Sequence, residues 1–117
     1  MSGLNLRERI TFQRLTEKTD IYGNVVAGWA DIETAPDTPL TVWANIRETP
    51  GKERVDAGRV EASATATIRI RSSAATRGVT EADRIMARGH VWNIRGIAPL
   101  GNKNAFLDIL CERGVAT

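Results

Sequence analysis

The sequence has 117 residues, of which 42% are hydrophobic and 26% charged, with a formal net charge of +2 and one cysteine. This composition indicates a single folded domain with a modest core and excludes a disordered chain. One cysteine excludes an intrachain disulfide. No apolar run approaches the ~20 residues that span a bilayer. The small net charge gives no sign of nucleic-acid binding.

The N-terminal part of the chain predicts two strands joined by a turn. Residues 9–15 alternate apolar and polar side chains, the period of a half-buried strand, with Ile10 and Phe12 on one face. Gly23-Asn24 is typical of a tight turn, so we expect a hairpin to a second strand over residues 25–32. Two prolines in residues 34–39 then predict a loop.

The third predicted strand covers residues 41–48 and is followed by a break in the β pattern. Trp43 is on the face opposite Val42 and Ala44, and we expect it in the core or an interface. Residues 50–62 are rich in charge and glycine, and too few apolar side chains are present to offset the entropy of ordering. We expect a long mobile loop here, or a short helix that orders on a partner.

Four further strands are predicted over residues 64–71, 84–88, 91–97 and 105–112. The first alternates most clearly, and a tight turn at Gly89-His90 joins the second and third. The last is apolar on both sides, so we expect it to be central or buried on both faces. The predicted fold class is all-β: one domain over residues 1–117, a small antiparallel β-barrel of about six to seven strands with a long charged loop between the third and fourth strands.

The residue types that carry catalysis or bind metals are not grouped in this sequence. His90 is predicted in a turn, and Cys111 is predicted to be a small buried hydrophobe. Pro50-Gly51-Lys52 lacks the glycines and the Ser/Thr of a phosphate-binding loop. We therefore expect no enzyme activity, no cofactor and no metal.

The arginines are the one group of residues in this sequence that could form a binding surface. Arg69 and Arg71 share a strand face, and several more arginines are on nearby predicted strands, so the set could form a basic stripe for a phosphate backbone. The favoured alternative is that long arginine stems cover the sheet while their head groups stay in water. The candidate DNA-facing residues are Arg69, Arg71, Arg84, Arg88 and Arg95.

Short landmarks follow one another along nearly the whole chain. They are Leu6-x-x-Arg9-Ile10, Asp20-x-x-Gly23-Asn24, Gly28-Trp29, Val42-Trp43-Ala44-x-Ile46, Ile68-Arg69-Ile70-Arg71, Asp83-Arg84-Ile85 and Trp92-x-Ile94-x-Gly96-Ile97. No single landmark is specific, but this ordered series resembles the head-closure, or head–tail joining, proteins of long-tailed phages. Val91-Trp92 departs mildly from the aromatic pair usual in that family.

The resemblance implies a structural virion component that forms a homo-oligomeric ring beneath the portal and adaptor, where it retains packaged DNA and offers the tail a surface. DNA would pass through the channel without sequence-specific recognition. Such a protein would be assembled in the host cytoplasm without contacting a membrane, and it could be monomeric when free. The alternatives are a tail-completion or connector protein of a phage or phage-derived particle, and a small nucleic-acid-binding β-barrel.

The segment over residues 50–62 fits an arm that orders on a partner, and we expect it to contact the adaptor ring or to reach into the channel. Its surface-contact candidates are Lys52, Glu53, Arg54, Val55, Arg59 and Val60. The alternative is a surface loop without a role.

Overall fold

The computed structural model describes residues 6–56, 59–101 and 105–113, and their side chains outside residues 50–63. Nearly all of the described chain is in strands, with one turn of 3₁₀ helix, η1, at Thr76–Gly78. The strands are β1 (Glu8–Thr19), β2 (Val25–Asp31), β3 (Glu33–Ala35), β4 (Thr38–Pro39), β5 (Thr41–Asp56), β6 (Arg59–Arg71), β7 (Arg84–Ala87), β8 (His90–Leu100) and β9 (Phe106–Arg113).

Seven of these strands form one antiparallel sheet in the order β2-β1-β5-β6-β9-β8-β7, while β3 and β4 form a separate two-stranded ribbon. β1 also pairs with β7, through Phe12 opposite Ile85, so the pairings run in a ring through β1, β5, β6, β9, β8 and β7. The prediction of an all-β antiparallel fold is confirmed, and the last strand, β9, is central between β6 and β8.

The core is formed by the side chains that alternate inward along these strands. The clearest predicted strand behaves as expected, because Ala64, Ala66, Ile68 and Ile70 are all buried along β6. Trp92 is fully buried, and its indole Nε1–H donates a hydrogen bond to the carbonyl of Ala87 at 3.2 Å. A buried indole with its one donor satisfied adds apolar area without an unpaired polar group.

The β7–β8 turn differs by one residue from the predicted position. Ala87 pairs with His90, so the two turn residues are Arg88 and Gly89, with φ of 52° and 73°. Positive φ at both central residues matches the twist of a two-residue hairpin. The turn aims the Arg88 side chain back towards β1 and β5.

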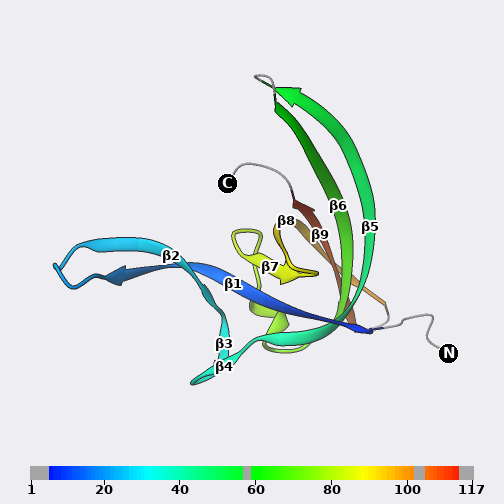
Figure 1. The fold of residues 1–117 in the computed structure, drawn as a ribbon. Helices are drawn as coiled ribbons and strands as arrows, with labels where there is room; N and C mark the ends of the chain where they lie inside the picture. Colours follow the sequence, from blue (N-terminus) through cyan, green and yellow to red (C-terminus); the bar gives the residue numbers. More distant parts are fainter. Residues whose placement is uncertain (1–5, 57–58, 102–104, 114–117) are drawn as a thin grey trace.

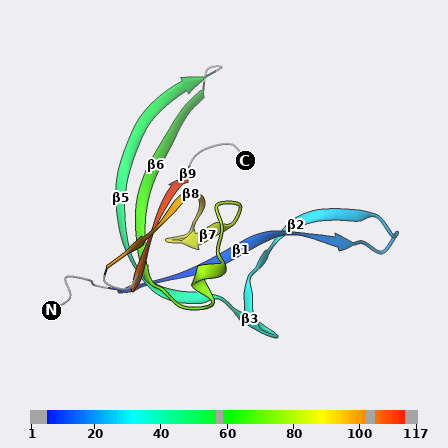
Figure 2. The ribbon, with the colours of Figure 1, turned by 180° about the vertical axis from the view of Figure 1, so that it is seen from behind.

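The expected charged loop over residues 50–62 is instead the outer part of a long β5–β6 hairpin. Val55 pairs with Val60 and Asp56 with Arg59, and the register shifts between Pro50 and Glu53. Composition misled the prediction because backbone pairing that starts on the core can extend outward without further apolar burial. Figures 1 and 2 show this hairpin projecting from the body, as does the β1–β2 hairpin.

These projections make the chain extended for its length. The radius of gyration is 16.0 Å, whereas a compact domain of this size would have about 13 Å. The molecule measures 54 × 43 × 20 Å along its principal axes. A small body therefore carries two long arms that lie outside its core.

Four charged side chains connect strands that are distant in sequence. Arg88 binds both carboxylate oxygens of Glu8, at 2.6 and 2.7 Å, and one oxygen of Glu48 at 3.0 Å. Arg113 binds the other oxygen of Glu48 at 2.8 Å. The network joins β1, β5, β9 and the β7–β8 turn, and it consists of charge-assisted bonds, the stronger kind. Hydrogen bonds from Arg113, and then from Arg88, lower the pKa of Glu48.

Truncation of a core side chain tests the packing. We expect Ile68→Ala to lower the free energy of unfolding by about 2–5 kcal/mol, because Ile68 is fully buried and a cavity would remain. The matched control is Leu110→Ala on β9, where the side chain is 51% exposed and the change should stay within about 0.5 kcal/mol. Equal losses for the two variants, measured by urea unfolding, would contradict the assignment of the inner face.

Acid should weaken the charged network. Because the pKa of Glu48 is lower in the folded chain than its ordinary value of 4.5, its contribution to stability is present above that value and is lost as the pH falls below it. We expect the free energy of unfolding of Glu48→Gln to fall less steeply than that of the natural protein below about pH 4.5. Parallel stability curves from pH 7 to pH 3 would rule this contribution out.

Candidate functional site

The five arginines proposed from sequence do not form one unpaired basic stripe. Arg69 makes a two-point ion pair with Asp108, at 2.6 and 2.9 Å, and this pair raises the pKa of Arg69. Arg95 binds Glu112 at 2.9 Å, and Arg88 belongs to the network described above. Three of the five charges are thus balanced by carboxylates within the same chain.

The other two arginines lie against aromatic rings. The Arg84 guanidinium is 4.2 Å from the centroid of the Trp29 ring and donates to the Gln13 side chain at 2.9 Å. Burial lowers the pKa of Arg84. Arg71 lies 5.7 Å from the centroid of Phe106. Cation–π contacts of this kind fix the guanidinium without neutralising its charge. Whether any of the five faces DNA stays a prediction.

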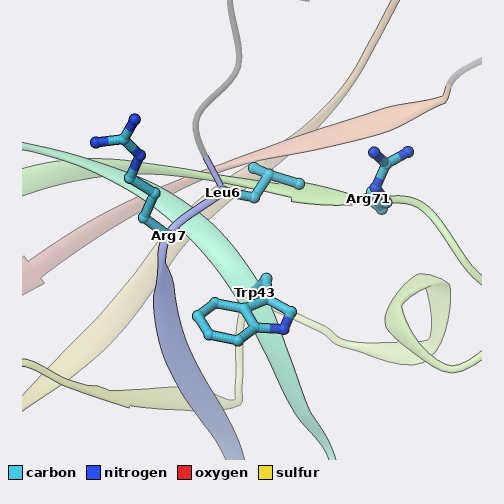
Figure 3. Close-up of a pocket in the computed structure, with 4 residues that line it drawn as sticks. All are labelled: Leu6, Arg7, Trp43 and Arg71. Carbon is cyan, nitrogen blue, oxygen red and sulfur yellow. The ribbon is translucent and has the colours of Figure 1, made fainter.

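A concave basic and aromatic surface lies where the start of β1, the start of β5 and the end of β6 meet. A pocket of about 560 Å³ is lined by Leu6, Arg7, Trp43 and Arg71, and we call it the Trp43 pocket. Figure 3 shows Leu6 between Arg7 and Arg71, with the Trp43 ring below them. The sequence predicted Trp43 to be in the core or in an interface. Its side chain is 51% exposed, so it is not part of the core.

The Trp43 pocket is rich in uncompensated positive charge. Arg9, the register partner of Trp43, places its guanidinium 4.8 Å from the centroid of that ring. Within the described side chains, none of Arg7, Arg9 and Arg71 contacts a carboxylate. Sequence reasoning missed Arg7 and Arg9 as site residues. The available signal was their two-residue spacing, which puts both on one face of the extended segment that leads into β1.

The second unusual surface is the β1–β2 hairpin, whose turn is held by one carboxylate. Asp20 accepts hydrogen bonds from the backbone N–H groups of Asn24 and Tyr22, at 2.9 and 2.8 Å, and these bonds, the one from Asn24 above all, lower the pKa of Asp20. Gly23 has φ of 81°, a conformation that glycine adopts without strain. The turn thereby presents Ile21, 91% exposed, and Tyr22, 80% exposed, to solvent. We call residues 20–24 the hairpin tip.

Reactive groups are not assembled in the part of the chain that the structure describes. Cys111 is buried, and burial raises the pKa of its thiol to about 12, the property of an inert side chain. His90 is exposed at the start of β8. No three His, Cys, Asp or Glu side chains within the described ranges are placed to hold a metal ion. Among the same residues, no helix has the length and apolar character to cross a membrane.

The residues proposed as an assembly loop, Lys52, Glu53, Arg54, Val55, Arg59 and Val60, lie on the outer β5–β6 hairpin. Their backbone pairings are described, but their side chains lie outside the described part of the structure. Their contact role therefore stays a prediction.

Comparison with known proteins places this architecture in a family. Two solved structures match over 100% of both chains with a TM-score of 0.64: a chain from the virion of a native gene transfer agent particle, 20% identical, and protein SF1141 from Shigella flexneri 2a, 27% identical. No curated protein matches. The family model described as phage head completion protein matches residues 1–114. With this match over nearly its full length, the chain belongs to the phage head completion protein family, and it is a structural component of the virion.

Proposed function

We propose that this protein closes filled heads as a ring subunit beneath the portal and adaptor, retains the packaged DNA and provides the surface to which the tail attaches. The observation that carries the proposal is the family match over residues 1–114. The described fold adds a physical reason, because a small body with two projecting hairpins exposes more surface than an isolated domain needs. The protein acts by binding, without catalysis, and is assembled in the host cytoplasm.

The charge distribution suits a wall along which DNA must slide. A phosphate-binding surface gains affinity from each unpaired cation that displaces counterions. Here Arg69, Arg88 and Arg95 each pair with an acidic side chain. Such a wall would confine DNA without binding it tightly. This supports a mechanism in which the protein retains DNA by blocking the channel and not by high affinity for DNA.

The β5–β6 hairpin is the element that we assign to blocking the channel or contacting the adaptor. It extends a ladder that begins on the core, so its direction is set by the sheet. A projecting arm of this kind can reach past the body of its own subunit. The similar fold of a chain in a gene transfer agent virion supports a place in such a particle.

Electron microscopy of particles from a strain lacking this gene tests the proposed function. We expect packaged or leaking heads beside separate, finished tails, because the surface that joins them would be missing. Re-expression of the natural protein should restore joined particles. Normal heads with aberrant tails would instead indicate tail completion. Unchanged particles would overturn a virion role and favour a small nucleic-acid-binding domain.

Shortening the β5–β6 hairpin separates DNA retention from folding. Replacing residues 51–63 by Asn-Gly would close the ladder at the Pro50–Ala64 pair with a two-residue turn. We expect a folded protein that joins the particle but leaves less nuclease-resistant DNA inside the head. Full retention of DNA by particles that contain the shortened protein would exclude this hairpin from channel closure.

A further inference from the structure

We propose that the hairpin tip of one copy inserts Ile21 and Tyr22 into the Trp43 pocket of the next copy, so that head-to-tail contacts build the assembly. This inference rests on the proposed ring and names the contact that would hold it together. The two surfaces it joins, the hairpin tip and the Trp43 pocket, are not covered by any other part of the described chain.

The tip has the properties of an anchor. Ile21 and Tyr22 are almost fully exposed, and Val25 beside them is 65% exposed, although large apolar side chains gain free energy when buried. The Asp20 hydrogen bonds and the Gly23 conformation hold this turn in one shape before any partner binds. A preorganised tip loses little conformational entropy on docking, which favours binding.

The pocket has the properties of the matching receptor. Its volume of about 560 Å³ and its mixed lining can take an aromatic side chain, with the Trp43 ring as one wall. Tryptophan, tyrosine and arginine are the residues most enriched where protein interfaces gain their binding energy. Arg7 and Arg71 stand at the edge, where they can pair with acidic side chains beside an incoming tip.

Charge favours this pairing of surfaces. The outer end of the β1–β2 hairpin, residues 16–25, carries two acidic residues, Glu17 and Asp20, and one lysine, Lys18, which gives a net charge of −1. The pocket region carries Arg7, Arg9 and Arg71 without a carboxylate contact in the described side chains. Opposite potentials on the two surfaces steer the encounter and fix its orientation.

The tip cannot reach the pocket of its own chain. Arg7 and the tip flank opposite ends of β1, a strand of 12 residues. At about 3.3 Å per residue, the strand holds them on the order of 40 Å apart. The occupant must therefore come from another molecule. Because tip and pocket are different surfaces, each added copy leaves one of each free, and such a contact produces a closed ring or a filament.

Disulfide trapping in purified particles tests the contact. We expect the double variant Val25→Cys with Arg7→Cys, which keeps Tyr22 and Trp43, to give a ladder of covalent oligomers on a denaturing gel after mild oxidation, since each copy would be linked to two neighbours. Neither single variant should give a ladder. Cys111 is 2% exposed and should not contribute. Dimers from Val25→Cys alone would indicate a symmetric contact and overturn the proposal.

A second probe covers the case in which the cysteine variants do not fold. A photo-activated benzoylphenylalanine in place of Tyr22 should cross-link, within particles, to a peptide of a second copy that contains Leu6, Arg7 or Trp43. The same probe in place of Thr34, an exposed residue of β3, is the control and should not reach that peptide. Cross-links from position 22 to a different virion protein, or none to this chain, would overturn the contact. Absence of the natural protein from purified particles would instead refute the proposed function.

Discussion

The fold depends on one buried carboxylate that holds the sheet closed. The Asp83 side chain is 1% exposed and accepts two hydrogen bonds from Arg14 on β1, at 2.9 and 3.0 Å, and one from the Thr80 N–H at 2.8 Å. Arg14 also donates to the Gly78 carbonyl at 2.9 Å. These bonds tie the segment before β7 to β1, where the pairing of β7 with β1 completes the ring. A buried carboxylate is tolerated only when it is paired and hydrogen-bonded, so the pair specifies where β7 must enter.

Elsewhere on the molecule, ion pairs within the chain show which surfaces already have their charges neutralised. Arg69 with Asp108 and Arg95 with Glu112 are pairs between neighbouring strands, and each satisfies both charges locally. The Arg69–Asp108 pair is mostly buried and the Arg95–Glu112 pair is more exposed, and both leave no unbalanced charge for a partner. The cations around Trp43 differ because Arg9 and Arg71 lie against aromatic rings and, within the described side chains, are not paired with carboxylates. A group of unbalanced charges beside an exposed indole is a surface that a partner can complete.

Local pattern was enough to predict the class of fold and the seven strands of the main sheet, because alternation reports directly which side chains of a strand are buried. It missed the short ribbon of β3 and β4, which lies where a loop was predicted over residues 34–39. It predicted the inward face of β6 from Ala64 to Ile70 and the buried state of Cys111. It failed for residues 50–62. There the strands only extend the β5–β6 ladder that begins on the core, so the sequence has no alternation of apolar residues. Local pattern also could not predict the Trp43 pocket. Leu6, Trp43 and Arg71 come together only through the pairing of β1 with β5 and of β5 with β6.

The two projecting hairpins link this fold to its role in a virion. A two-stranded hairpin outside a core is only marginally stable in water, so its strands gain from contact with another protein. One small tip-and-pocket contact would bury too little surface to hold two free copies together firmly. In a closed ring, each copy makes two such contacts at once, and the high effective concentration of neighbours strengthens each of them. A subunit built in this way would remain separate until a template gathers its copies, and it would then assemble at that template.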